Sequence, residues 1–192
     1  MNDHFELKQL LIENEGNLCH MYLDTVGRVT VGVGHMIPNV HEAEKLSFVL
    51  HGCTTQATLD QIASDYAKVE SQQRGMLAEH YRPFTALDMT PSAIDELLSL
   101  DIATMEAGVR AAFHGYDTYP APAQDALLDM AFNLGVNGLV TKFPHLKAAA
   151  EAGDWQTCAA ECRRNGISDA RNEKTRTLFE NAKSGRSMSL TA

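Results

Sequence analysis

The sequence lacks several features that would assign the chain to a common class of protein. No apolar run approaches the roughly 18 residues that a membrane-spanning helix needs, so we expect no membrane insertion. The 25 acidic residues outnumber the 16 lysines and arginines, which gives a net charge of -9 and disfavours nucleic-acid binding. The hydrophobic fraction of 44% is that of an ordinary globular protein.

Cysteine and histidine patterns give no indication of a metal site. The sequence contains four cysteines: Cys19, Cys53, Cys158 and Cys162. They form no C-x-x-C pair, and Lys45 stands where an H-E-x-x-H motif starting at His41 would need its second histidine. We therefore expect no metal, no organic cofactor and free thiols. A disulfide between Cys158 and Cys162, four residues apart on one predicted helix, is the alternative.

The stretch from Glu15 to His35 gathers two carboxylates, a hydroxyl and a glycine-rich strand. Glu15 closes a helical pattern, and Gly16 is a typical helix stop. Asp24 follows nine residues later in a predicted turn, and Thr30 lies six residues further on, in an alternating strand. A helix end that leads into a hairpin can bring these three polar side chains to one wall of a cleft.

These residue types suit glycoside hydrolysis, which needs one carboxyl that keeps its proton and one that stays ionised. Glu15 lies at the negative end of a helix dipole, whereas Asp24 lies in a turn among backbone amides. The Thr30 hydroxyl could hold a water molecule. Taken singly, Glu15 is more simply a surface helix residue and Asp24 an ordinary turn former.

The combined spacing, E-G-x7-D-x5-T-x-G-x-G-H, resembles that of the phage-type lysozymes of glycoside hydrolase family 24. The flanking residues also match: Tyr22, Gly27, Gly32, Gly34 and His35. The resemblance implies that Glu15 is the general acid, that Asp24 orients or activates the attacking water, and that Thr30 helps to place it. It also implies an α+β, mainly α fold of two lobes, one with a small β-hairpin and one helical.

Three further residues are implied in substrate binding. Gly32 would let substrate, or a packing neighbour, approach the backbone closely. Asn133 would line the cleft floor, unless it only caps the end of its helix. Arg171 lies eight residues before Phe179, as in the family's arginine motif, and would reach Glu15 or the substrate.

Another pair of residues is assigned a structural role by the same resemblance. In the family, the histidine after the Gly-x-Gly segment pairs with an aspartate on a long central helix. The corresponding residues here are His35 and Asp101, which we expect to form a structural ion pair.

We expect a single lysozyme-like domain at residues 1–183, followed by a flexible tail at 184–192. Its parts in chain order are a hairpin lobe at about 16–38, an extra helical insertion at about 39–84 and a helical lobe at about 90–183. Periodicity and capping residues predict helices at 3–15, 38–50, 54–74, 90–113, 123–134, 143–153, 155–164 and 171–182. The role of the insertion is open between substrate choice, partner binding and decoration.

The implied function is that of a bacteriolytic N-acetylmuramidase, which hydrolyses the β-1,4 bond between N-acetylmuramic acid and N-acetylglucosamine in peptidoglycan. A lytic transglycosylase is one alternative, but it would need neither Asp24 nor Thr30. A non-catalytic wall-binding module is another, but it would not need Glu15.

The route to the wall is left open by the sequence. Residues 1–6 lack the basic and apolar regions of a signal peptide, so we expect synthesis in the cytoplasm and action on the wall in the periplasm. The protein would be a phage endolysin that acts on its own host, or a secreted antibacterial effector, a toxin that acts on a target cell. The acidic charge and the absence of a signal peptide favour the effector, for which an immunity or carrier protein is a candidate partner. We expect a monomer.

Overall fold

The computed structural model describes residues 4–184, which have the predicted mainly helical α+β fold with a small antiparallel sheet near the N-terminus. Most of the predicted tail therefore lies outside the described residues. The described chain divides into two compact units. One comprises residues 15–101 and is called the sheet unit; the other comprises residues 4–14 and 102–184 and is called the helical unit.

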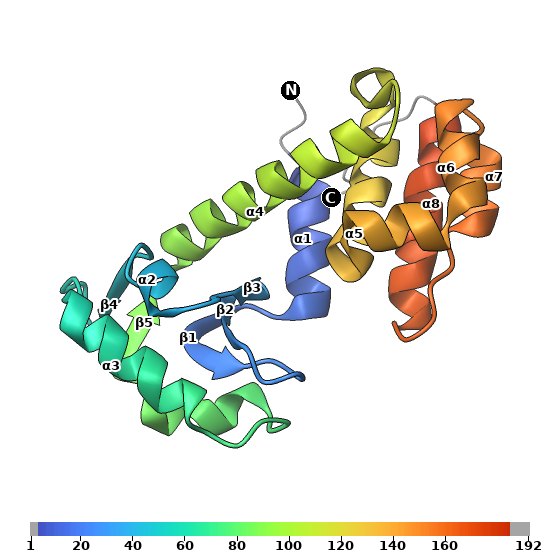
Figure 1. The fold of residues 1–192 in the computed structure, drawn as a ribbon. Coiled ribbons are helices and arrows are strands. Elements are labelled where there is room, and N and C mark those ends of the chain that lie inside the picture. The colour runs from blue at the N-terminus through green and yellow to red at the C-terminus, as the bar shows by residue number, and fades with distance from the viewer. Residues whose placement is uncertain (1–3, 185–192) are drawn as a thin grey trace, which may run out of the picture. The chain divides into compact units, whose positions relative to one another are not determined.

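The sheet unit contains two antiparallel sheets, three complete helices and the first half of a fourth helix, α4 (Pro91–Ala112) (Figure 1). One sheet has the strand order β1-β2-β3, and the other pairs β4 with β5. The elements are β1 (Leu18–Leu23), β2 (Val29–Gly32), β3 (His35–Met36), α2 (Val40–Ala43), β4 (Phe48–Leu50), α3 (Leu59–Glu70), the 3-10 helix η1 (Ala78–Phe84) and β5 (Leu87–Met89).

Part of the helical prediction for the insertion was wrong. Residues 48–50, predicted to end a helix, form strand β4, because Phe48 pairs with Met89 of β5 and both side chains are buried there. Helix α3 begins at Leu59 rather than at 54, because Thr58 and Gln61 form a capping box that starts the helix there.

The insertion is built into the core of the sheet unit. Helices α3 and η1 both pack against β1. The Asp65 carboxylate, 1% exposed, accepts hydrogen bonds from the amides of Ala86 and Leu87 at 2.7 and 3.0 Å. His20 of β1 lies 3.1 Å from the Ala78 carbonyl, through Nε2. The segment therefore supports the strand that leads to Asp24.

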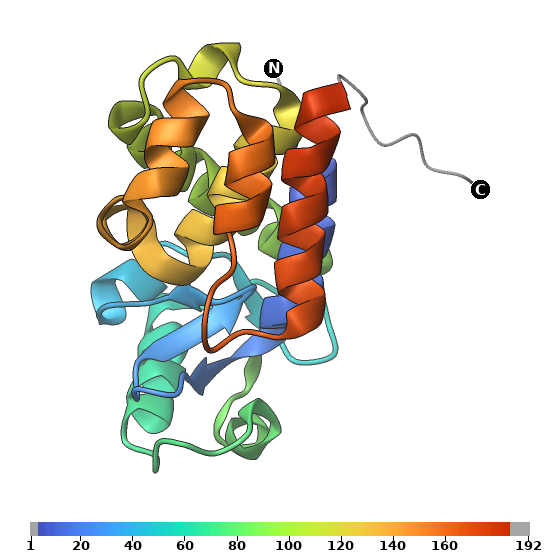
Figure 2. The ribbon, with the colours of Figure 1, turned by 90° about the vertical axis from the view of Figure 1, so that its right-hand side faces the viewer.

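The helical unit contains most of the long helices (Figure 2). Its elements are η2 (Tyr116–Thr118), α5 (Ala121–Lys142), α6 (Pro144–Glu151), α7 (Trp155–Glu161) and α8 (Asp169–Ser184), with most of α1 (Phe5–Glu15) and the second half of α4 (Pro91–Ala112). Helix α8 packs against α5 and α7, and α6 packs against α7. Helix α5 bends at Gly135, which has a φ of 70° that L side chains rarely adopt.

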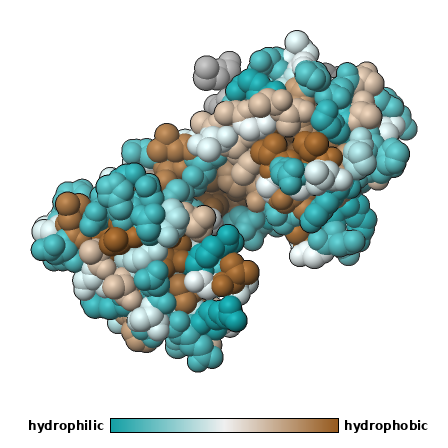
Figure 3. Space-filling view, viewed as in Figure 1, coloured by the Kyte–Doolittle hydropathy of each residue, from teal (hydrophilic) through white to brown (hydrophobic). Residues whose placement is uncertain are grey.

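Hydrophilic residues cover most of the face shown in Figure 3, and hydrophobic residues occur there in small separate groups. Within residues 4–184, no helix is both long enough and apolar enough to cross a membrane.

Candidate active site

Glu15 is held at the end of α1. Gly16 adopts a φ of 84°, which ends the helix, and the Asn14 side-chain amide donates to the Leu10 carbonyl at 2.7 Å. A Cβ atom built on Gly34 would lie 3.9 Å from Glu15 Cβ. The glycine-rich segment after β2 therefore runs beside Glu15, whose side chain is exposed.

Asp24 lies in the tight turn that joins β1 to β2. The turn is closed by backbone hydrogen bonds from Asp24 to the Arg28 carbonyl at 2.9 Å and from Gly27 to the Asp24 carbonyl at 3.0 Å. One carboxylate oxygen, Oδ1, accepts from the amides of Val26 and Arg28 at 3.0 and 2.8 Å. The other, Oδ2, accepts from Arg28 Nε at 2.9 Å. The local turn thus presents a carboxylate with a fixed orientation.

These donors keep Asp24 ionised. Partial burial alone would raise its pKa, but the hydrogen bonds from Arg28 and from the Val26 amide outweigh burial and hold the pKa of Asp24 below its usual value. An ionised carboxylate that accepts hydrogen bonds is suited to orient a water molecule.

Thr30 lies on β2 directly opposite Tyr22 of β1. The Thr30 side chain is buried, at 3% exposed, and its hydroxyl donates to the Arg28 carbonyl at 3.0 Å. The hydroxyl oxygen therefore still has lone pairs that can accept from a water molecule. Burial, followed by the negative charges of Glu15 and Asp24, raises the pKa of Tyr22. Tyr22, which is paired with Thr30, therefore experiences the negative charge of both carboxylates.

Two other predicted residues lie near the same strands. Gly32 has a φ of 65°, so any other residue there would strain the backbone, and a Cβ atom built on it would contact Ile94 Cγ2 at 3.4 Å. His35 Nδ1 lies 2.9 Å from Asp101 Oδ1, so the expected pair is in contact. This contact ties β3 to α4 within the sheet unit.

The remaining two predicted residues belong to the helical unit. Asn133 is exposed on α5, two residues before the bend at Gly135. Arg171 is 4% exposed, and its Nε donates to Asp129 Oδ1 at 2.9 Å. Arg171 therefore pairs with a buried carboxylate inside the helical unit. The contacts of Asn133 and Arg171 with substrate stay predictions.

Comparison with known proteins places the chain in a family. The family described as Phage lysozyme matches residues 12–180. The chain belongs to this family. Its members are glycoside hydrolases, and the matched range includes Glu15, Asp24 and Thr30.

The chain is also similar to a structural protein of a bacteriophage. The chain is 28% identical over 163 residues to the pre-baseplate central spike protein Gp5 of Enterobacteria phage T4. The match covers 81% of this chain but 24% of Gp5, so the chain spans about a quarter of the length of that relative.

The sequence alone did not identify two residues that hold predicted site residues of this phage-lysozyme chain in place. Arg28 holds the Asp24 carboxylate, and the signal that could have identified it is a cation four residues after an acid in a tight turn. Asp129 pairs with Arg171, and it stood out only as a charged residue in a strongly apolar helix.

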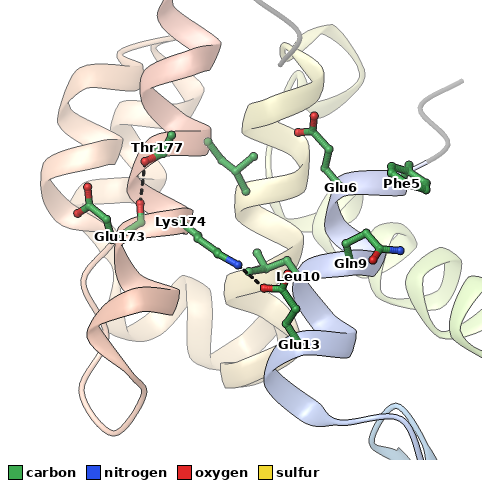
Figure 4. A pocket seen from close by; sticks show the side chains of 9 residues that line it. Phe5, Glu6, Gln9, Leu10, Glu13, Glu173, Lys174 and Thr177 are labelled. Atoms are coloured by element: carbon green, nitrogen blue, oxygen red, sulfur yellow. Dashed lines mark hydrogen bonds and ion pairs between the residues drawn. The ribbon is translucent and has the colours of Figure 1, made fainter. Parts of the chain in front are cut away.

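A groove of about 310 Å³ lies between α1 and α8 of the helical unit (Figure 4). Its apolar lining includes Phe5, Leu10 and Leu178, and Lys174 forms an ion pair with Glu13 there. None of the predicted site residues lines this groove. Among residues 4–184, no group of three histidine, cysteine or acidic side chains is arranged to hold a metal ion.

Proposed function

We propose that this chain is an N-acetylmuramidase that hydrolyses the β-1,4 bond between N-acetylmuramic acid and N-acetylglucosamine in peptidoglycan. The observation that carries the proposal is geometric: the turn beside Thr30 holds the Asp24 carboxylate through Arg28, and the segment that follows β2 runs beside Glu15, in a chain of the Phage lysozyme family. One acid, one ionised carboxylate and one hydroxyl are the groups that such a hydrolysis requires.

In the proposed reaction, Glu15 donates a proton to the glycosidic oxygen as the bond to the anomeric carbon breaks. A water molecule on the opposite face of the sugar donates one hydrogen bond to Asp24 and one to the Thr30 oxygen. One of its lone pairs faces the anomeric carbon and forms the new bond, and the proton that it shares with Asp24 passes to that carboxylate. Attack from the opposite face inverts the anomeric configuration, which requires carboxyl groups about 6.5 to 9.5 Å apart.

The two alternatives differ from the proposal in what they need. A lytic transglycosylase would use Glu15 alone and release anhydro ends, and it would leave the hydrogen bonds around Asp24 without a catalytic purpose. A wall-binding module would depend on neither carboxylate. The hydrogen-bonded, ionised state of Asp24 therefore favours hydrolysis by water.

The proposed substrate and place of action rest on the comparisons with known proteins as well as on the net charge of the chain. Peptidoglycan is the proposed partner and the periplasm the proposed place of action. A phage family and a phage relative favour a phage enzyme over the secreted effector that the net charge of -9 suggested. An immunity partner would be expected only for the effector.

The test is digestion of purified peptidoglycan by the full chain, with mass spectrometry of the fragments. We expect reducing N-acetylmuramic acid ends, and a loss of at least about 100-fold in rate for Glu15→Gln and for Asp24→Asn. Glu13→Gln, the same change on an exposed residue of α1, is the matched control and should keep full activity. Anhydro ends, with Asp24→Asn still active, would establish a transglycosylase instead.

A further inference from the structure

The groove between α1 and α8 has an apolar floor, and all the residues that line it belong to the helical unit. Leu10 of α1 and Leu178 of α8 are each 6% exposed, and Phe5, at the start of α1, is 52% exposed. The groove volume of about 310 Å³ is roughly twice that of an engineered cavity of about 150 Å³ that binds benzene. The groove therefore has room for two apolar side chains.

The groove is elongated along the two helices that form it. Its lining residues on α1 run from Phe5 to Glu13, which corresponds to about 12 Å of helix rise, or roughly two turns. Those on α8 run from Glu173 to Leu178. A helix that lies in such a groove inserts apolar side chains spaced three or four residues apart. The shape therefore fits a helix with two apolar side chains one turn apart better than a compact small molecule.

The charged residues on the rim of the groove differ in whether they have a partner. The Lys174 side chain reaches across from α8 to an ion pair with Glu13 of α1 (Figure 4). Glu173 accepts a hydrogen bond from Arg176 Nε at 2.9 Å. The Glu6 carboxylate, by contrast, makes no ion pair or hydrogen bond within the part of the chain that the structure describes. Glu6 therefore has no cation beside it.

The surroundings of Glu6 favour binding of a cation. Partial burial and then the negative charge of Asp125 raise the pKa of Glu6, because both disfavour its ionised form. A positive charge beside Glu6 would offset this cost. The net charge of -9 also attracts a cationic partner at long range and repels an acidic one. The occupant of the groove therefore needs a positive side chain as well as apolar ones.

We propose that the groove between α1 and α8 binds a basic amphipathic helix of a partner protein. Two apolar side chains of that helix, one turn apart, lie against Leu10 and Leu178, and a lysine or arginine beside them pairs with Glu6. None of the residues proposed to react with peptidoglycan lines the groove. The groove is therefore a docking surface that the partner can occupy without competing for those residues.

The experiment uses the full chain and a fluorescent synthetic peptide of leucine and lysine as the probe. The peptide has about 14 residues, or roughly four helical turns, with its leucines at helical spacing. Fluorescence anisotropy gives Kd. One comparison peptide has glutamate in place of every lysine, and another has the same composition in an order that leaves no apolar stripe. We expect the basic amphipathic peptide to bind at least about tenfold more tightly than either.

Variants of the chain locate the binding. Thr177→Trp fills the groove from α8 and should weaken binding at least about tenfold. Its matched control is Thr141→Trp on α5, outside the groove, because each threonine hydroxyl donates to the carbonyl four residues earlier. Glu6→Gln should weaken binding about fivefold, the effect of one partly exposed ion pair. Glu161→Gln, the same loss of charge on α7, should change Kd less than about twofold.

Several outcomes would contradict the proposal. Equal weakening by Glu6→Gln and Glu161→Gln would mean that the peptide responds only to net charge. Unchanged binding in Thr177→Trp, or no binding of the basic peptide to the folded wild type, would also overturn it. Sedimentation of the chain alone tests another occupant, because a dimer that Thr177→Trp dissociates would assign the groove to a second copy. All four variants should digest peptidoglycan at the rate of the wild type, so the muramidase proposal can fail without affecting this one.

Discussion

Arg28 binds the Asp24 carboxylate through two different groups, its amide at 2.8 Å from Oδ1 and its side-chain Nε at 2.9 Å from Oδ2. Both residues belong to one turn, so the turn that places the carboxylate also supplies its positive charge. The Asp24 side chain is 22% exposed, which leaves it open to a water molecule. A carboxylate held this way is a weak base, and its main contribution is to orient the water.

The first prediction concerns the pH dependence of kcat/KM. Because the pKa of Asp24 is lowered, its ionised form should persist below the ordinary aspartate pKa of about 3.9, and the acidic limb of activity should lie correspondingly low. Arg28→Gln removes the guanidinium, so the pKa of Asp24 should rise and the acidic limb should move to higher pH. Rates on a soluble glycan across the acid range measure this shift. An acidic limb that does not move in Arg28→Gln would show that another group controls it.

The second prediction concerns the hydroxyl of Thr30. Thr30→Val keeps the shape of the side chain but cannot accept a hydrogen bond from the water, so kcat should fall about 100-fold with little change in KM. Loss of the bond to the Arg28 carbonyl should also lower the free energy of unfolding by about 1 kcal/mol. Thr30→Ser keeps the hydroxyl and is the control. Similar kcat values for the valine and serine variants would remove Thr30 from the mechanism.

Local signals in the sequence were sufficient to predict the helix ends and the turn that are fixed by neighbouring residues. Gly16 ends α1 at Glu15, and Thr90 begins α4, where its Oγ1 accepts from the Ala93 amide at 3.2 Å. The turn at Asp24 is likewise closed by its own backbone. These features place the carboxylates, which is why the spacing of the motif was informative.

Features that depend on distant partners could not be predicted in this way. Strand β4 exists because Phe48 meets Met89, a pairing between residues far apart in the chain that no local window contains. The contact of Arg74 with Gly27 likewise needs the insertion to pack on β1. A periodic pattern identifies a buried face but not the segment that covers it.

The third prediction concerns the thiols. All four cysteines are free, and burial raises the pKa of Cys158 to about 12 and that of Cys162 to about 11. The thiolate is the reactive form, so both should be inert to a thiol reagent at neutral pH, whereas the exposed Cys53 should react fast. Cys53→Ser should remove the fast phase, and all four thiols should titrate in denaturant. Only two titratable thiols in denaturant would instead indicate a disulfide.

The fourth prediction concerns the buried charges of the helical unit. Asp129, on α5, is fully buried and pairs with Arg164 at 2.6 Å and with Arg171 at 2.8 Å. Asp129→Asn leaves two buried guanidinium groups without the carboxylate that they share, so the free energy of unfolding should fall by about 3 to 5 kcal/mol. Trp155, the single tryptophan, lies in this unit, and its fluorescence during urea unfolding measures the change.

The matched control for Asp129→Asn is Asp169→Asn, which breaks an exposed pair with Arg163 in the same unit and should change the stability by less than about 0.5 kcal/mol. The contrast between the two variants follows from solvation: water stabilises the exposed guanidinium after the change but cannot reach the buried ones. Equal stability of the two variants would mean that the surrounding groups, such as Thr175, compensate for the lost charge. Arg171 would then be held in place by its other contacts, and Asp129 would not be needed to position it.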